Sequence, residues 1–225
     1  MRLVCPKGSS AKPFLKQDAK AMYVPASFAV DDLEELHSAI EKYSFATLFS
    51  AVQGDLVATH LPLLLDRSNG PHGTLLGHVA RANHQAEQAE NQSVLAIFSG
   101  PHAYISPTWY EASPAVPTWN YVAVHAYGKL KVVTSKSELT AMLDRMVTLY
   151  ESGLPSPWKL DSQSEYFDRL LPQIVGFQIQ IERLEGKWKL SQNHSPGRQE
   201  KVAAALQAQP DESSQAIASL MRSPY

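Results

Sequence analysis

The sequence is poor in cysteine, in long apolar runs and in positive charge, and each shortage excludes a class of protein. Cys5 is the single cysteine among 225 residues, which excludes an internal disulfide and a cysteine-rich zinc site. Leu3 to Cys5 is followed at once by Pro6 and Lys7, and no apolar run reaches about 18 residues, so we expect neither a signal peptide nor a membrane-spanning helix. The formal net charge of -2 provides no positive field for nucleic acid or an anionic membrane. We therefore predict a cytoplasmic protein.

Common catalytic and metal-binding motifs are also absent from the sequence. It contains no P-loop, no G-x-G-x-x-G and no G-x-S-x-G. Its eight histidines show no H-x-H, H-x-x-x-H or H-E-x-x-H spacing. We therefore expect no metal site, and we interpret His60, His78, His102 and His125 as hydrogen-bonded structural histidines.

Apolar residues make up 44% of the chain, which is sufficient for one core with appended helices. Residues 1–20 are polar and aperiodic and are predicted to be an extension, residues 21–194 one domain, and residues 195–225 a helical hairpin. Paired runs of alternating residues predict an antiparallel barrel, mainly β with peripheral helices. The expected strands cover residues 45–52, 56–65, 74–80, 94–99, 121–134, 177–182 and 188–192.

Helix and turn signals separate these strands. Asp31 and Ser135 are each predicted to cap a helix. Residues 100–120 are rich in proline and aromatics and are predicted to be irregular, and Glu185-Gly186-Lys187 is predicted to form a turn. The expected helices span residues 31–43, 83–90, 135–151, 199–207 and 212–221.

The run from Gly77 to Asn83 places Arg81 at the end of a strand and the start of a helix. A cation beside the unpaired backbone N–H groups of a helix start suits a phosphate. The alternative interpretation is that Arg81 pairs with a surface acid such as Glu87, while Asn83 only caps the helix.

The run from Gly100 to Tyr110 combines histidine, tyrosine, serine and tryptophan in a segment stiffened by prolines. Its aromatic side chains offer flat apolar walls for a planar ligand. An aromatic patch buried in a subunit interface explains the same composition, so both interpretations stay open.

Two further runs carry polar side chains on predicted strands. Asn120 lies between two aromatic residues and can bond the edge of a polar heterocycle, or alternatively the local backbone. In the run 187–194, Lys189 shares a strand face with Ser191 and Asn193. This lysine can meet a phosphate, and the alternative is a solvated side chain.

These motifs together resemble the PaiB family of FMN-binding proteins, and the resemblance covers nearly all of the chain after residue 20. Five ordered motifs, with P-T-W-N-Y-V-A-V-H among them, carry it, and His84 stands where the family usually has a proline. The resemblance implies a split β-barrel similar to that of pyridoxamine-phosphate oxidases and flavin reductases. It also implies a homodimer with FMN in a groove at the subunit interface. The matching segments are residues 22–25, 60–62, 77–83, 100–110, 117–125 and 189–193.

The resemblance further implies roles for single residues. Arg81, assisted by Ser106, would clamp the phosphate of FMN, and the side chains of Asn120 and Gln192 would meet the edge of the isoalloxazine ring. An aromatic side chain of the run 100–110 would shield a ring face. The binding residues carried over are His60, His78, Ala80, Arg81, Asn83, Tyr104, Ser106, Trp109, Asn120, Lys189 and Gln192.

The expected function is a flavin-dependent redox reaction or the sensing of redox state, with no catalytic residue assigned. The family label also implies transcriptional regulation. However, the last predicted helix carries no Lys or Arg before Arg222, so direct DNA binding is not expected. The alternative is a haem-binding or haem-degrading split barrel, with His60 or His102 as the axial ligand.

Overall fold

The computed structural model describes residues 22–111 and 113–223, and the extension predicted for residues 1–20 lies outside them. The strands are β1 (Ala29–Val30), β2 (Phe45–Val52), β3 (Asp55–Pro62), β4 (Leu64–Asp66), β5 (Thr74–Ala80), β6 (Ser93–Ile105), β7 (Thr118–Val133) and β8 (Ile174–Lys189). They form one antiparallel sheet in the order β3-β2-β6-β7-β8-β5-β4, with β1 added beside β8. β3 also contacts β5, so the two sides of the sheet curl toward each other.

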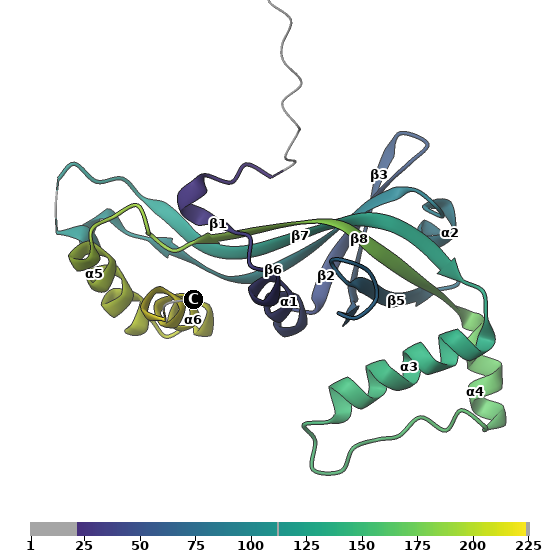
Figure 1. The fold of residues 1–225 in the computed structure, drawn as a ribbon. Coiled ribbons are helices and arrows are strands. Elements are labelled where there is room, and N and C mark those ends of the chain that lie inside the picture. Colours follow the sequence, from purple (N-terminus) through teal and green to yellow (C-terminus); the bar gives the residue numbers. More distant parts are fainter. Residues whose placement is uncertain (1–21, 112, 224–225) are drawn as a thin grey trace, which may run out of the picture.

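Three long strands, β6, β7 and β8, run the length of the molecule (Figure 1). β7 pairs with β8 from Tyr121 opposite Lys189 to Val133 opposite Gly176. Even-numbered residues of β7 such as Val124 are buried, whereas most odd-numbered ones are half-buried. One face of this ribbon therefore packs on the core, and the other is left partly open.

The first helix, α1 (Leu33–Lys42), packs against the core through Ile40 and its neighbours. It begins after Asp32, whose carboxylate accepts a hydrogen bond from the backbone N–H of Glu35 at 2.9 Å. The predicted cap at Asp31 is therefore wrong by one residue, because the cap must stand three residues before the N–H that it binds.

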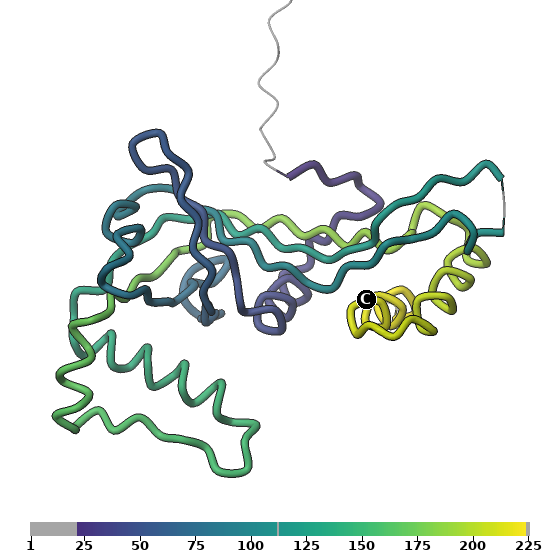
Figure 2. Tube along the Cα trace, turned by 180° about the vertical axis from the view of Figure 1, so that it is seen from behind, coloured from purple at the N-terminus to yellow at the C-terminus, as the bar shows by residue number. Residues whose placement is uncertain are grey.

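Helices lie at both ends of the ribbon (Figures 1 and 2). α3 (Lys136–Glu151) and α4 (Glu165–Leu170) lie at one end, and α5 (Pro196–Gln207) and α6 (Glu212–Arg222) at the other. The Ser135 cap and the two C-terminal helices are confirmed, whereas the short α4 was not predicted. Within the described residues, no helix is long and apolar enough to cross a membrane.

The segment 100–120 was predicted to be irregular, and this prediction is wrong for part of the segment. β6 continues through Gly100 and Pro101 to Ile105, with a shift of register against β7 after Ser99. A proline has no N–H for the ladder, but a bulge tolerates one, so the strand does not end there. What remains irregular is the 3-10 helix η2 (Pro107–Tyr110) and the loop that follows it.

Two other predicted elements are shorter than expected. The predicted strand 56–65 is divided at Leu63 into β3 and β4, although the N–H of Leu63 still donates to the carbonyl of Ser44, its neighbour in the β2–β3 register, at 2.9 Å. The helix 83–90 shrinks to α2 (Gln85–Gln88), and Asn91 beyond it has a φ of 61°, which a helix cannot contain.

The predicted turn at 185–187 and the returning strand 188–192 are wrong, because β8 runs unbroken to Lys189. A register shift opposite Tyr127 and Gly128 leaves Glu182 as an extra residue in β8. The apolar residues that face the core therefore change from odd numbers before Glu182 (Phe177, Ile179, Ile181) to even numbers after it (Leu184, Trp188), although Glu185 and Lys187 are buried as well. In a sequence, that change of phase is typical of the end of a strand.

Gly186 does not form a turn; it allows neighbouring segments to pack closely against β8. It pairs with Val30 of β1, and a Cβ at this position would lie 2.8 Å from the Val30 carbonyl oxygen. The same Cβ would lie 2.4 Å from Cδ2 of Leu36. A glycine here allows β1 and α1 to approach the middle of β8.

Gly186→Ala is predicted to lower the free energy of unfolding by about 1–3 kcal/mol, because the added methyl group pushes β1 away from β8. Urea unfolding with an unchanged m-value measures the loss. Gly153→Ala is the matched control, since a Cβ there meets nothing within 4 Å. Equal midpoints for the two variants would contradict the packing explanation.

Candidate functional site

The residues predicted to bind a cofactor form two groups at opposite ends of the β7–β8 ribbon. We call them the barrel group (His60, His78, Ala80, Arg81 and Asn83) and the distal group (Tyr104, Ser106, Trp109, Asn120, Lys189 and Gln192). From the β8 residue paired with Val79 to Lys189, the strand covers roughly 46 Å at about 3.3 Å per residue. Ala80 and Arg81 therefore lie too far from Lys189 along the strand for one small ligand to touch them all. The row of strand pairs through His60 reaches β8 at Glu185.

In the barrel group, Arg81 is held by local partners. Its Nη1 lies 2.9 Å from Glu87 Oε1, and its Nη2 and Nε donate to the carbonyls of Ile174 and Pro172. Asn83 Oδ1 accepts a hydrogen bond from the N–H of Gln85 at 3.0 Å. The structure thus shows the ion pair of the alternative interpretation, whereas the N-cap of the helix is His84 and Asn83 forms an Asx turn just before it. Because a guanidinium carries five N–H donors and 52% of this side chain is exposed, Arg81 keeps donors for an anion.

The two histidines of the barrel group differ in their surroundings. His60 is exposed, and its Nδ1 lies 3.0 Å from Thr47 Oγ1. His78 is half-buried, and burial lowers the pKa of its imidazole. Its buried Nδ1 has no hydrogen-bond partner among the described residues. His78 therefore offers one free hydrogen-bonding atom on a ring that stays neutral near pH 7.

The distal group presents an exposed row of aromatic rings. Tyr104 and Trp119 are partners across β6 and β7, with ring centroids 5.9 Å apart and planes close to perpendicular. Their exposed fractions are 46% and 53%. His102, two residues before Tyr104 on β6, also packs near Trp119, at 6.0 Å between centroids. Such a row can cover one face of a flat ring.

Two other members of the distal group form side-chain hydrogen bonds within the chain. Asn120 is fully buried, its Nδ2 donates to Ser191 Oγ at 3.0 Å, and its Oδ1 accepts from the same hydroxyl at 3.3 Å. The side chain of Gln192 returns to its own strand end, where it accepts from Leu190 N–H and donates to the Trp188 carbonyl. Both amides therefore hold the chain where β8 ends, and their predicted contact with a ring edge stays a prediction.

The two members of the distal group at η2 also have local contacts. Ser106 caps η2 by accepting from the N–H of Thr108, and its hydroxyl lies 2.7 Å from Thr108 Oγ1. Trp109 packs against the core. The neighbouring Tyr110, which sequence reasoning did not single out, is the residue of this segment that lines a cavity.

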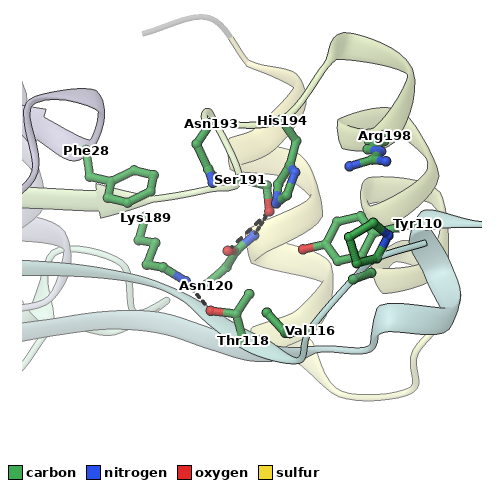
Figure 3. A pocket seen from close by; sticks show the side chains of 12 residues that line it. Phe28, Tyr110, Val116, Thr118, Asn120, Lys189, Ser191, Asn193, His194 and Arg198 are labelled. Carbon is green, nitrogen blue, oxygen red and sulfur yellow. Dashed lines mark hydrogen bonds between the residues drawn. The ribbon is translucent and has the colours of Figure 1, made fainter. Parts of the chain in front are cut away.

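That cavity lies beside the distal group and has a volume of about 390 Å³ (Figure 3). Lys189 enters it from β8, and Phe28 from the 3-10 helix η1 (Ala26–Phe28) packs near the Lys189 ammonium. Arg198 of α5 lines the opposite side. Sequence reasoning found Lys189 but missed Phe28 and Arg198, because only the fold brings these three segments together.

Between the two groups, the partly open face of the ribbon carries a satisfied polar network. Glu185 accepts hydrogen bonds from the Tyr127 hydroxyl and from the N–H of Met22, each at 3.1 Å, and pairs with Arg183. The Arg183 guanidinium lies 3.7 Å from the centre of the Tyr127 ring. Burial lowers the pKa of His125 in this network. Among the described residues, no cluster of three metal-ligating side chains occurs here or elsewhere.

Comparison with known proteins of similar sequence and fold indicates the class of protein to which this chain belongs. The family model described as "Putative FMN-binding domain" matches residues 22–183. The Bacillus subtilis protein named "Protease synthase and sporulation protein PAI 2" is 38% identical over 202 residues, covering 89% of this chain and 96% of that protein.

Two solved structures share the fold at 13% sequence identity. The flavocytochrome Anf3 from Azotobacter vinelandii has a TM-score of 0.59, over 76% of this chain and 74% of that one. The FAD and haem binding protein from Mycobacterium smegmatis has a TM-score of 0.57, over 78% of this chain and 79% of that one.

Together with the sheet topology, these likenesses define a split β-barrel with peripheral helices, as predicted. The chain belongs to the PaiB family of FMN-binding-domain proteins.

His78 is predicted to make folding sensitive to acid. Burial lowers its pKa in the folded chain, so the unfolded chain takes up the proton more readily. The free energy of unfolding should therefore fall as the pH drops through about 6.5, the ordinary value for histidine. His78→Gln should reduce that fall between about pH 8 and pH 5.5 without abolishing it, since burial also lowers the pKa of His125 and His194.

Urea unfolding at both pH values measures the effect. The value at about pH 8, where histidine is neutral in both states, gives the structural cost of the substitution alone. An identical fall in the variant and the wild-type protein would show that His78 does not carry the effect.

Proposed function

We propose that this protein binds FMN as a homodimer and uses it in a redox reaction or to sense redox state. The observation that carries the proposal is the separation of the barrel and distal groups along the β7–β8 ribbon. A two-fold axis through the open face of the ribbon would set the distal group of one chain beside the barrel group of its partner. Two equivalent sites, each shared between chains, would result.

The side chains of the two groups suit the parts of FMN. Arg81 offers a partly exposed guanidinium for the phosphate. The exposed rings of Tyr104 and Trp119 offer a cover for the flat ring system, and the free Nδ1 of His78 offers a hydrogen bond. When bound, FMN supplies hydride and one-electron chemistry, and the chain supplies position and charge.

The open face of the sheet supports the dimer. Phe49, Leu95 and Tyr127 lie in one row across β2, β6 and β7, and all three are half-buried in the single chain. At the edge of the same sheet, Phe45 and Leu56 are largely exposed. An apolar sheet face of this kind is typical of a subunit interface.

The family label implies regulation as well as flavin binding. The Bacillus subtilis relative is named "Protease synthase and sporulation protein PAI 2". For this chain we propose that any such role is indirect, because α6 contains no Lys or Arg before Arg222 and the net charge is -2. The redox state of a bound flavin would then be the signal.

Titration with FMN, followed by quenching of flavin fluorescence, tests the cofactor. We expect saturation at or below tens of micromolar and an increase in Kd of about tenfold or more in Arg81→Ala. Arg145→Ala is the matched control, because Arg145 also forms a 2.9 Å ion pair, with Asp66, outside both groups.

Glu87→Gln gives a second check on Arg81. It removes the acid that competes with an anion for the guanidinium, so FMN binding should be retained or tightened. No quenching in the wild-type protein would sink the flavin proposal. A Soret band on titration with haem would then favour a haem protein, with His60 or His102 as candidate ligand.

Light scattering tests the dimer. The wild-type protein should have twice the chain mass of 24.8 kDa. Phe49→Asp should give single chains that no longer bind FMN, because it places a charge in the apolar row. Tyr166→Asp, on the exposed side of α4, should change neither property. A wild-type mass of one chain would refute the shared site.

A further inference from the structure

The cavity beside the distal group contains a hydroxyl that the chain leaves without a partner. Tyr110 is 3% exposed, and its buried hydroxyl has no hydrogen-bond partner among the described residues. In Figure 3 this hydroxyl points toward the interior of the cavity, on the side of Asn120. The Asn120 amide does not serve it, because that amide is bonded to Ser191 and its Nδ2 also contacts Met221 Sδ. Since buried hydroxyls are normally paired, Tyr110 has a donor available for a ligand.

The same cavity has an uncompensated positive charge. Lys189 and Arg198 both line it, and none of the described lining residues is Asp or Glu. Arg198 forms no ion pair or side-chain hydrogen bond within the described chain, so its whole guanidinium fork is available. The Lys189 ammonium donates to the Trp119 carbonyl and to the Thr118 hydroxyl, which leaves one N–H.

Two titratable groups at the cavity have a lowered pKa. The pKa of His194 is lowered by burial and by the cations Arg198 and Lys189. The pKa of Lys189 is lowered by burial and by Lys187. His194 also packs against Tyr110, with ring centroids 4.7 Å apart and planes tilted by 41°, and both residues line the same cavity as the two cations. The first turn of α5 borders the cavity through Arg198 and adds the positive end of a helix dipole.

The remaining wall of the cavity is apolar, and this favours an organic anion over an inorganic one as the ligand. Phe28, Pro114, Ala115 and Val116 provide the apolar lining, and Phe28 also packs near the Lys189 ammonium. A bare phosphate would leave this wall uncovered, whereas a small ring with an acid group would cover it and reach the donors. The volume of about 390 Å³ is near the lower limit for ligand pockets, which points to a small molecule.

We propose that this cavity binds a small organic carboxylate, with the Tyr110 hydroxyl and the Arg198 guanidinium on the carboxylate and Phe28 and Val116 on the apolar body. Lys189 supplies a second cation at the rim. The cavity shares Asn120 and Lys189 with the distal group but contains none of the barrel group, so we expect its ligand to bind beside FMN rather than in its place. It therefore adds a ligand to the flavin that we propose for the dimer.

Calorimetric titration of the full chain with benzoate tests the proposal. We expect saturation with a Kd on the order of 1 mM or tighter, as ligand efficiency allows for so small a molecule. Benzyl alcohol, which has the same ring and no charge, should bind at least about tenfold more weakly. Inorganic phosphate should not saturate at concentrations where benzoate does. Saturation by phosphate and not by benzoate would overturn the carboxylate assignment.

Variants of this chain locate the binding. Tyr110→Phe and Arg198→Gln should each weaken benzoate binding by about tenfold. Lys201→Gln is the matched control on the same helix, because Lys201 pairs with Glu111 and does not line the cavity. Unchanged binding in both cavity variants would overturn the site.

Two further measurements separate this inference from the flavin proposal and from a folding defect. The benzoate Kd should be the same with and without excess FMN, and competition between the two would assign the cavity to the flavin site instead. Tyr110→Phe should unfold at the same temperature as the wild-type protein or higher, since it removes an unpaired buried hydroxyl. A lower unfolding temperature would show that the hydroxyl has a partner inside the chain and would contradict the proposal.

Discussion

β7 and β8 pair over nearly their full lengths, from Tyr121 opposite Lys189 to Val133 opposite Gly176. Every other element is placed by this ribbon. β6 continues the sheet on the β7 side, and β5 and β1 pair with β8. Helices α3 and α4 lie at one end of the ribbon, and α5 and α6 lie at the other. Because the ribbon is long, Arg81 and Lys189 are kept apart within one chain, and the homodimer that we propose would bring such residues together between chains.

Local signals in the sequence predicted much of this fold. Strands β2 and β5 and the Ser135 helix have the predicted bounds, since hydrophobic alternation and a capping serine act within a few residues. The errors occur where a strand is interrupted without ending. At Gly100-Pro101 and at Glu182 the sequence shows a breaker or a change of phase, but neighbouring strands hold the backbone in the sheet.

The candidate site was less predictable, for a physical reason. Residue type indicates which chemistry a side chain can perform, but hydrogen bonds to distant segments decide whether it is free to do so. Asn120 and Gln192 carry suitable amides, yet both are used within the chain. Tyr110 and Arg198 have ordinary surroundings in the sequence, and only the packing of η2 against α5 brings them to one cavity.

The extra residue in β8 has a consequence for how this chain tolerates changes in length. At Glu182 two successive side chains lie on the open face, so the loss of one residue there would still leave Phe177 and Trp188 in the core. A single deletion between Arg183 and Trp188 would instead exchange the two faces and turn the Trp188 side chain out of the core. In the descent of such barrels, insertions and deletions should therefore accumulate at the bulge and in the long connection between α3 and α4, and should be rare in the strand segment between the bulge and the distal end.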